Sequence, residues 1–147
     1  MYGAILLLHI LAATVWTGGH LVLACAILPR VLRERAPAKL LEFESSYERI
    51  GIPALVVQVV TGLWLAHRLV PELGRWLAFD DPVASLVGAK LLLLAITVGF
   101  ALDARLRLIP RLSEANLGAL VWHIVPVTLV SVLFVFVAVA FRTGWFY

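Results

Sequence analysis

The chain has 147 residues, of which 63% are hydrophobic and 14% charged, with a mean hydropathy of +1.01 and a formal net charge of +3. Soluble domains are closer to half apolar and a quarter charged, so this composition excludes a water-soluble globular protein and favours an integral membrane protein. The basic residues lie beside the apolar segments, where the preference of positive charge for the cytoplasmic side explains them, so no nucleic-acid partner is expected. The only cysteine, Cys25, excludes an intrachain disulfide.

Four apolar segments are predicted to cross the membrane as helices, over residues 3–28, 47–70, 83–109 and 117–141. Each segment has the ~20 residues that an α-helix needs to cross ~30 Å of hydrocarbon. Pro29, Pro71 and Pro110 are expected to end the first three helices. The predicted fold is therefore all-α, a four-helix transmembrane bundle made by a single integral membrane domain over residues 1–147.

The lysines and arginines predict how the bundle is oriented. The connections after the first and third segments, with the start of the second, hold eight of them: Arg30, Arg33, Arg35, Lys39, Arg49, Arg105, Arg107 and Arg111. The other side holds four, Arg68, Arg75, Lys90 and Arg142. The positive-inside rule places the first group in the cytoplasm and both termini on the non-cytoplasmic side. We expect a multi-pass protein of a bacterial inner (cytoplasmic) membrane, surrounded by lipid.

All four histidines lie within the predicted membrane segments. His9 and His20 are eleven residues apart in the first segment, which is ~16 Å along a helix and roughly the same face of it. His67 lies about one turn from the outer end of the second segment, and His123 about two turns after the inner start of the fourth. Depth therefore pairs His20 with His123 at the inner level, and His9 with His67 at the outer level. A titratable ring inside a membrane helix is a functional hypothesis by default.

Two facing imidazoles can bind haem iron as axial ligands, and helix bundles build such sites from side chains on facing helices. The sequence predicts b-type haem, one or two per chain, held by His20 with His123 and, at a second site, by His9 with His67. Two haems would make a path for electron transfer across the membrane, with a quinone or porphyrin partner and a haem-dependent oxidoreductase activity. Basic side chains would bind the haem propionates: Arg49, Arg105 or Arg107 at the inner level, and Lys90 or Arg68 at the outer level.

The same histidines have other uses. Imidazole also binds Cu(II), whereas Cu(I) prefers sulfur ligands. Met1 and Cys25 are the only sulfur-containing residues, and this scarcity favours haem over a Cu(I) path. A quinone or proton site is a third use, and a structural or assembly subunit, including a homodimer, needs no ligand. Lys90 is read either as an interfacial lysine that reaches the surface or as the partner of an anionic group.

Three segments resemble the CopD-like copper-resistance membrane proteins. LLLHILAATVWTGGHLVLACAILPRVL is similar to their first helix, KLLLLAITVGFALDARLRLIPRL to their third and HIVPVTLVSVLFVFVAVAFRTGW to their last. The resemblance implies copper homeostasis or copper uptake, in which the four histidines would bind the metal and a periplasmic copper or redox protein would be a partner.

Shorter stretches are similar to the HemJ-like four-helix protoporphyrinogen oxidases, namely LHILAATVWTGG, ERIGIPALVVQVVTGL and AKLLLL. This weaker resemblance implies a functional, haem-related role for His9 and a functional role for Lys90.

Overall fold

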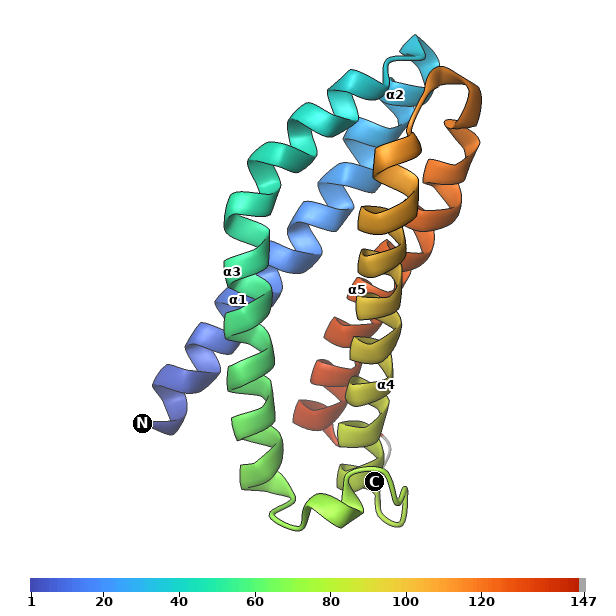
Figure 1. The fold of residues 1–147 in the computed structure, drawn as a ribbon. Helices are drawn as coiled ribbons and strands as arrows, with labels where there is room; N and C mark the ends of the chain where they lie inside the picture. The colour runs from blue at the N-terminus through green and yellow to red at the C-terminus, as the bar shows by residue number, and fades with distance from the viewer. Residues whose placement is uncertain (146–147) are drawn as a thin grey trace.

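The structure, a computed structural model, describes residues 1–145, and within them it is helical with no β-strand (Figure 1). Four helical stretches are long and apolar enough to cross a membrane, over Tyr2–Glu34, Pro37–Leu69, Pro82–Arg111 and Gly118–Thr143. The prediction of an all-α, four-helix transmembrane protein is therefore confirmed. That residues 1–147 form one domain stays a prediction, and residues 146 and 147 lie outside the described part.

The first span continues beyond Pro29, where the sequence predicts its end. It consists of α1 (Tyr2–Val22), the π-helical turn η1 (Leu23–Ile27) and α2 (Leu28–Glu34). In η1 the backbone N–H of Leu28 bonds to the carbonyl of Leu23, five residues back. A proline in a regular helix clashes with the carbonyl four residues before it, and the wider π turn relieves that clash. The helix therefore passes Pro29 without breaking.

The third span repeats this arrangement at the same end of the bundle. α4 (Pro82–Asp103) is followed by the π-helical turn η3 (Ala104–Leu108) and the 3₁₀ turn η4 (Ile109–Arg111). The N–H of Ile109 bonds to the carbonyl of Ala104, and Pro110 follows directly. In both spans the π turn therefore ends two residues before a proline.

The second span begins earlier than the apolar pattern predicts. α3 (Pro37–Leu69) starts ten residues before position 47, so the charged segment after the first span is helical. Arg35 ends α2 in the left-handed conformation, and Pro37 occupies the first turn of α3, where its missing N–H costs nothing. Glu34 pairs with Arg30 on its own helix and with Lys39 across this turn.

The remaining connections are short. Leu73–Arg75 forms the 3₁₀ turn η2 between α3 and α4, and Glu114–Asn116 forms η5 before α5 (Gly118–Thr143). The start of α1 and the end of α5 lie toward the end of the bundle that carries the α3–α4 connection (Figure 1). Which end faces the cytoplasm stays a prediction.

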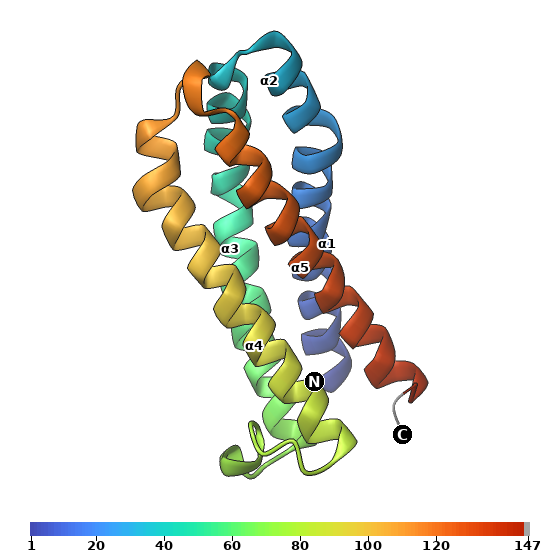
Figure 2. The same ribbon diagram turned by 90° about the vertical axis from the view of Figure 1, so that its right-hand side faces the viewer.

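The bundle consists of two closely packed helix pairs. α1 packs along α3 and α4 along α5, and the contact between α1 and α5 joins the two pairs (Figure 2). The largest buried apolar cluster lies at the end with the π turns and is formed by Leu28, Val31, Leu40, Leu108, Leu117, Leu120 and Ile124. Much of the remaining apolar surface is exposed on the helices, as a bilayer environment requires.

Candidate functional site

His20 is buried in the α1 part of the bundle, with 8% of its surface exposed. Its Nδ1 lies 2.8 Å from the carbonyl oxygen of Trp16 on the same helix. Because a carbonyl oxygen only accepts, this geometry assigns the proton to Nδ1 and the lone pair to Nε2. The ring packs against Trp16, at a centroid distance of 4.5 Å, and lies edge-on to Tyr47 at 6.3 Å. Among the described residues Nε2 has no hydrogen-bond partner.

Tyr47 holds this arrangement together, and its contact with α1 is absent from the sequence predictions. Its hydroxyl donates to the carbonyl of Val15 at 3.1 Å and is 3.3 Å from that of Trp16, the same oxygen that His20 uses. The ring lies close to Gly19, where an added Cβ would be only 2.2 Å from a ring carbon. A similar close approach occurs at Gly51. The available signal in the sequence was Gly19 in the first predicted helix and Gly51 in the second, because each leaves space for an aromatic ring.

His9 repeats the hydrogen-bonding pattern of His20 nearer the other end of α1. Its Nδ1 lies 2.9 Å from the hydroxyl of Thr61, and that hydroxyl donates its hydrogen to the carbonyl of Val57 at 2.6 Å. The threonine oxygen therefore accepts from Nδ1–H, and Nε2 again holds the lone pair. One turn away on α3, the side-chain oxygen of Gln58 is buried without a hydrogen-bond partner within residues 1–145.

His67 lies in the last turn of α3 and is exposed. No hydrogen bond or ring contact in the described structure joins it to His9, so the outer pair expected from depth is not formed as a contact.

His123 is half-buried and bonded at both ring nitrogens. Nε2 lies 2.6 Å from a carboxylate oxygen of Asp103 on α4, and Nδ1 lies 3.2 Å from the carbonyl of Ala119 on its own helix. The other carboxylate oxygen of Asp103 forms an ion pair, at 3.2 Å, with Arg107 four residues later on the same span. No described contact joins His123 to His20. The pairing of His20 with His123 that depth suggests therefore stays a prediction.

A groove adjoins the Asp103–His123 pair. It has a volume of about 350 Å³ and is lined by Ile96, Gly99, Phe100, Asp103 and His123. The ring of Phe100 meets that of His123 edge-on, at a centroid distance of 5.9 Å. The contact of Asp103 with His123 is also absent from the sequence predictions. The available signal in the sequence was that Asp103 lies at about the same depth as His123 on the adjacent span.

The basic residues predicted to bind haem propionates have other surroundings. Lys90 is half-buried, and its Nζ lies 5.2 Å from the ring centroid of Phe141, a cation–π contact. Arg105 pairs with Glu48 on α3, whereas Arg49 is exposed. None of the three makes a described hydrogen bond or ion pair with a histidine.

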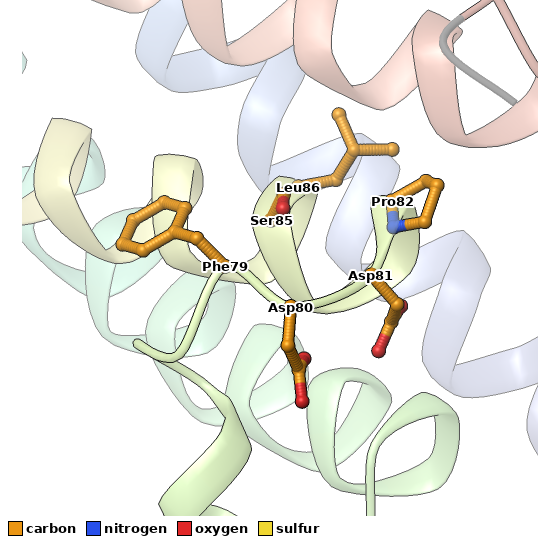
Figure 3. A pocket seen from close by; sticks show the side chains of 6 residues that line it. All are labelled: Phe79, Asp80, Asp81, Pro82, Ser85 and Leu86. Carbon is orange, nitrogen blue, oxygen red and sulfur yellow. The ribbon is translucent and has the colours of Figure 1, made fainter.

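A second pocket, of about 400 Å³, lies where the α3–α4 connection enters α4 (Figure 3). Its lining residues are Phe79, Asp80, Asp81, Pro82, Ser85 and Leu86. The two aspartates already bind Arg75, and Asp81 also accepts from the N–H of Ala84 and so caps α4. The hydrogen bond from Arg75 holds the pKa of Asp80 below its ordinary value. One arginine thus pairs with both carboxylates, and these contacts, with the cap on α4, stabilise the connection.

The donor atoms do not assemble a preformed metal cluster. Within residues 1–145 no group of three or more His, Cys, Asp or Glu side chains could hold one ion. Sulfur does not contribute to the histidine sites, because Cys25 is exposed on η1 and Met1 is 92% exposed. No described contact joins His20 to His123, so the prediction of haem between them stays a prediction without support from the structure.

The four apolar spans with their buried polar rings define a multi-pass helical membrane protein. The family model of copper resistance protein D (CopD) matches residues 41–141, about two thirds of the chain, and the protein belongs to this family. His67, Lys90, Asp103 and His123 lie inside the matched region, whereas His9 and His20 precede it. Comparisons with curated proteins and with solved structures gave no match. Membership confirms the CopD resemblance and favours the copper interpretation over haem b, while nothing supports the HemJ-like resemblance.

Proposed function

We propose that this membrane protein binds and passes copper ions through the imidazoles of His20 and His9. The family name, copper resistance protein D, supports copper as the cargo. The observation that carries the proposal is the buried His20, whose Nδ1 is held by the carbonyl of Trp16 while Nε2 has a free lone pair. Metal-binding histidines are commonly oriented in this way, with the second ring nitrogen donating to a carbonyl or carboxylate.

Passing an ion fits the donor set better than storing one. Among the described residues neither imidazole has two further His, Cys, Asp or Glu ligands beside it. Sites with few ligands bind weakly, and conduction requires binding that is strong enough for entry and weak enough for release. His9 and His20 lie on one helix, ~16 Å apart along it, so two such sites would succeed one another across the membrane.

The test is copper binding by the purified full-length protein in detergent. We would titrate it with Cu(I) under anaerobic conditions against a chromogenic chelator, and with Cu(II) by equilibrium dialysis and metal analysis. We expect His20→Gln to weaken binding at least tenfold and His9→Gln to lower the stoichiometry. The matched control, His67→Gln, changes an exposed histidine and should bind as the wild type does. Full copper binding by a folded His20→Gln variant would contradict the proposal.

The same sample tests the haem prediction. Oxidised and dithionite-reduced absorption spectra would show a Soret band that shifts on reduction if b-type haem were bound. A band lost in both His20→Gln and His123→Gln would restore the electron-transfer function predicted from depth. A colourless protein that binds copper would support the copper function instead.

A further inference from the structure

We propose that the groove beside Asp103 and His123 binds one phospholipid, with an acyl chain along α4 and an ethanolamine headgroup at Asp103 and Arg107. The groove has a volume of about 350 Å³ and lies between α4 and α5, which pack side by side (Figure 2). The copper path uses none of its lining residues, so this proposal stands apart from the copper function.

The groove opens toward the bilayer, on the side of α4 that faces away from α3. Ile96, Gly99 and Asp103 follow one another at intervals of three and four residues, so they share one face of the helix. Arg105, two residues after Asp103, pairs with Glu48 on α3, which places α3 roughly on the opposite side. Ile96 is 38% exposed, and Gly99 is exposed as well. In a bilayer an apolar surface of this kind contacts lipid chains.

Polarity changes along the groove as it does along a phospholipid. Residues 91–102 contain no charged side chain, and Asp103 follows them directly. Ile96 lies ~10 Å from Asp103 along the helix axis, a length that accommodates part of an acyl chain. Trp122, on the adjacent α5, is 78% exposed, and an amphipathic indole ring favours the level of the headgroups. The apolar part of the groove therefore lies in the hydrocarbon and its charged end at the headgroup level.

Asp103 and Arg107 present opposite charges side by side at this end, as the ammonium and phosphate of an ethanolamine headgroup do. Arg107 donates from Nη1 to Asp103 at 3.2 Å, and within residues 1–145 the rest of its guanidinium has no hydrogen-bond partner. Its side chain is 77% exposed, and its remaining N–H donors fit the oxygens of a phosphate. A carboxylate accepts about four hydrogen bonds. Asp103, which is 36% exposed, therefore has room for an ammonium besides Arg107 and His123.

Gly99 keeps the groove open and supplies the test. A Cβ at this position meets no atom within 4 Å, so a larger side chain enters the groove rather than the packing between helices. Phe100, whose ring meets that of His123 edge-on at 5.9 Å, forms the wall between α4 and α5. Leucine also suits a helix better than glycine. Gly99→Leu should therefore occupy the place of the acyl chain without unfolding the bundle.

The experiment is native mass spectrometry of the full-length protein in detergent, titrated with dioleoyl phosphatidylethanolamine. We expect one tightly bound lipid per chain. Arg107→Gln, which removes a charge-assisted hydrogen bond, and Gly99→Leu, which fills the groove, should each weaken binding about tenfold. The matched controls are Arg142→Gln, an exposed arginine at the other end of α5, and Gly3→Leu, an exposed glycine whose added Cβ meets nothing within 4 Å. Both should bind the lipid as the wild type does.

Two further ligands separate the lipid from its parts. Dioleoylglycerol, which lacks the headgroup, should bind the wild type no better than phosphatidylethanolamine binds Arg107→Gln. Phosphoethanolamine, which lacks the acyl chains, should leave the lipid bound even in large excess, and displacement would overturn the proposal in favour of a site for soluble phosphates. Circular dichroism would show that each variant folds. Lipid binding that is unchanged in folded Gly99→Leu, or a lipid-free wild-type dimer that Gly99→Leu converts to a monomer, would overturn the proposal as well.

Discussion

Replacing Gly19 by alanine tests whether the Tyr47 contact organises the α1–α3 pair. The added Cβ would lie 2.2 and 2.3 Å from two ring carbons of Tyr47 and 2.5 Å from its hydroxyl oxygen. Ordinary contacts begin near 3.4 Å, so the ring must retreat by about 1 Å or more, away from the carbonyls of Val15 and Trp16. Overpacking of this kind costs about 1–3 kcal/mol, and the lost hydrogen bond costs about 1 kcal/mol more. We expect a total near 2–4 kcal/mol.

The assay is unfolding in mixed detergent micelles, followed by circular dichroism. Gly18→Ala is the matched control, because a Cβ at the neighbouring position meets nothing within 4 Å. It should leave stability within about 1 kcal/mol of the wild type, since alanine suits a helix better than glycine. Adding Tyr47→Ala to Gly19→Ala should recover part of the loss that comes from the clash. If Gly19→Ala proves as stable as Gly18→Ala, the tight contact between Tyr47 and α1 is refuted.

Two further predictions concern the connection between α3 and α4. Asp81→Ala should lower the free energy of unfolding by about 1 kcal/mol, since the carboxylate caps α4. Asp81→Asn should keep most of the cap. Equal midpoints of thermal unfolding for the two variants would contradict a contribution from the cap. The pKa of Asp80 is lowered by the hydrogen bond from Arg75, so this interaction stabilises the fold above pH 3.8 and is lost as the pH falls through the lowered value. The melting temperatures of the wild type and Arg75→Ala should therefore differ at pH 7 and converge at acidic pH, and a gap that widens on acidification would contradict this sign.

Hydropathy alone predicted the four spans, because a membrane helix must bury its backbone hydrogen bonds in a continuous apolar stretch. It did not predict where the helices end. Pro29 and Pro110 each signal a helix stop, yet each follows a π turn that accommodates the proline ring. Such a turn depends on the packing around it, and the apolar pattern of the sequence carries no sign of it.

For the histidines, the sequence determined how far along each helix the ring lies, and the tertiary structure decided which neighbouring residues the ring meets. Spacing along each helix places His20 and His123 at a similar level, because the rise per residue is constant. Which neighbour each ring meets depends on how the helices are rotated about their axes, and that is set by packing between them. In the structure His20 lies beside Trp16 and Tyr47, while His123 faces Asp103, twenty residues earlier in the chain. The sequence thus determined that imidazoles lie within the membrane, and only the packing of α4 against α5 decided that one of them meets a carboxylate.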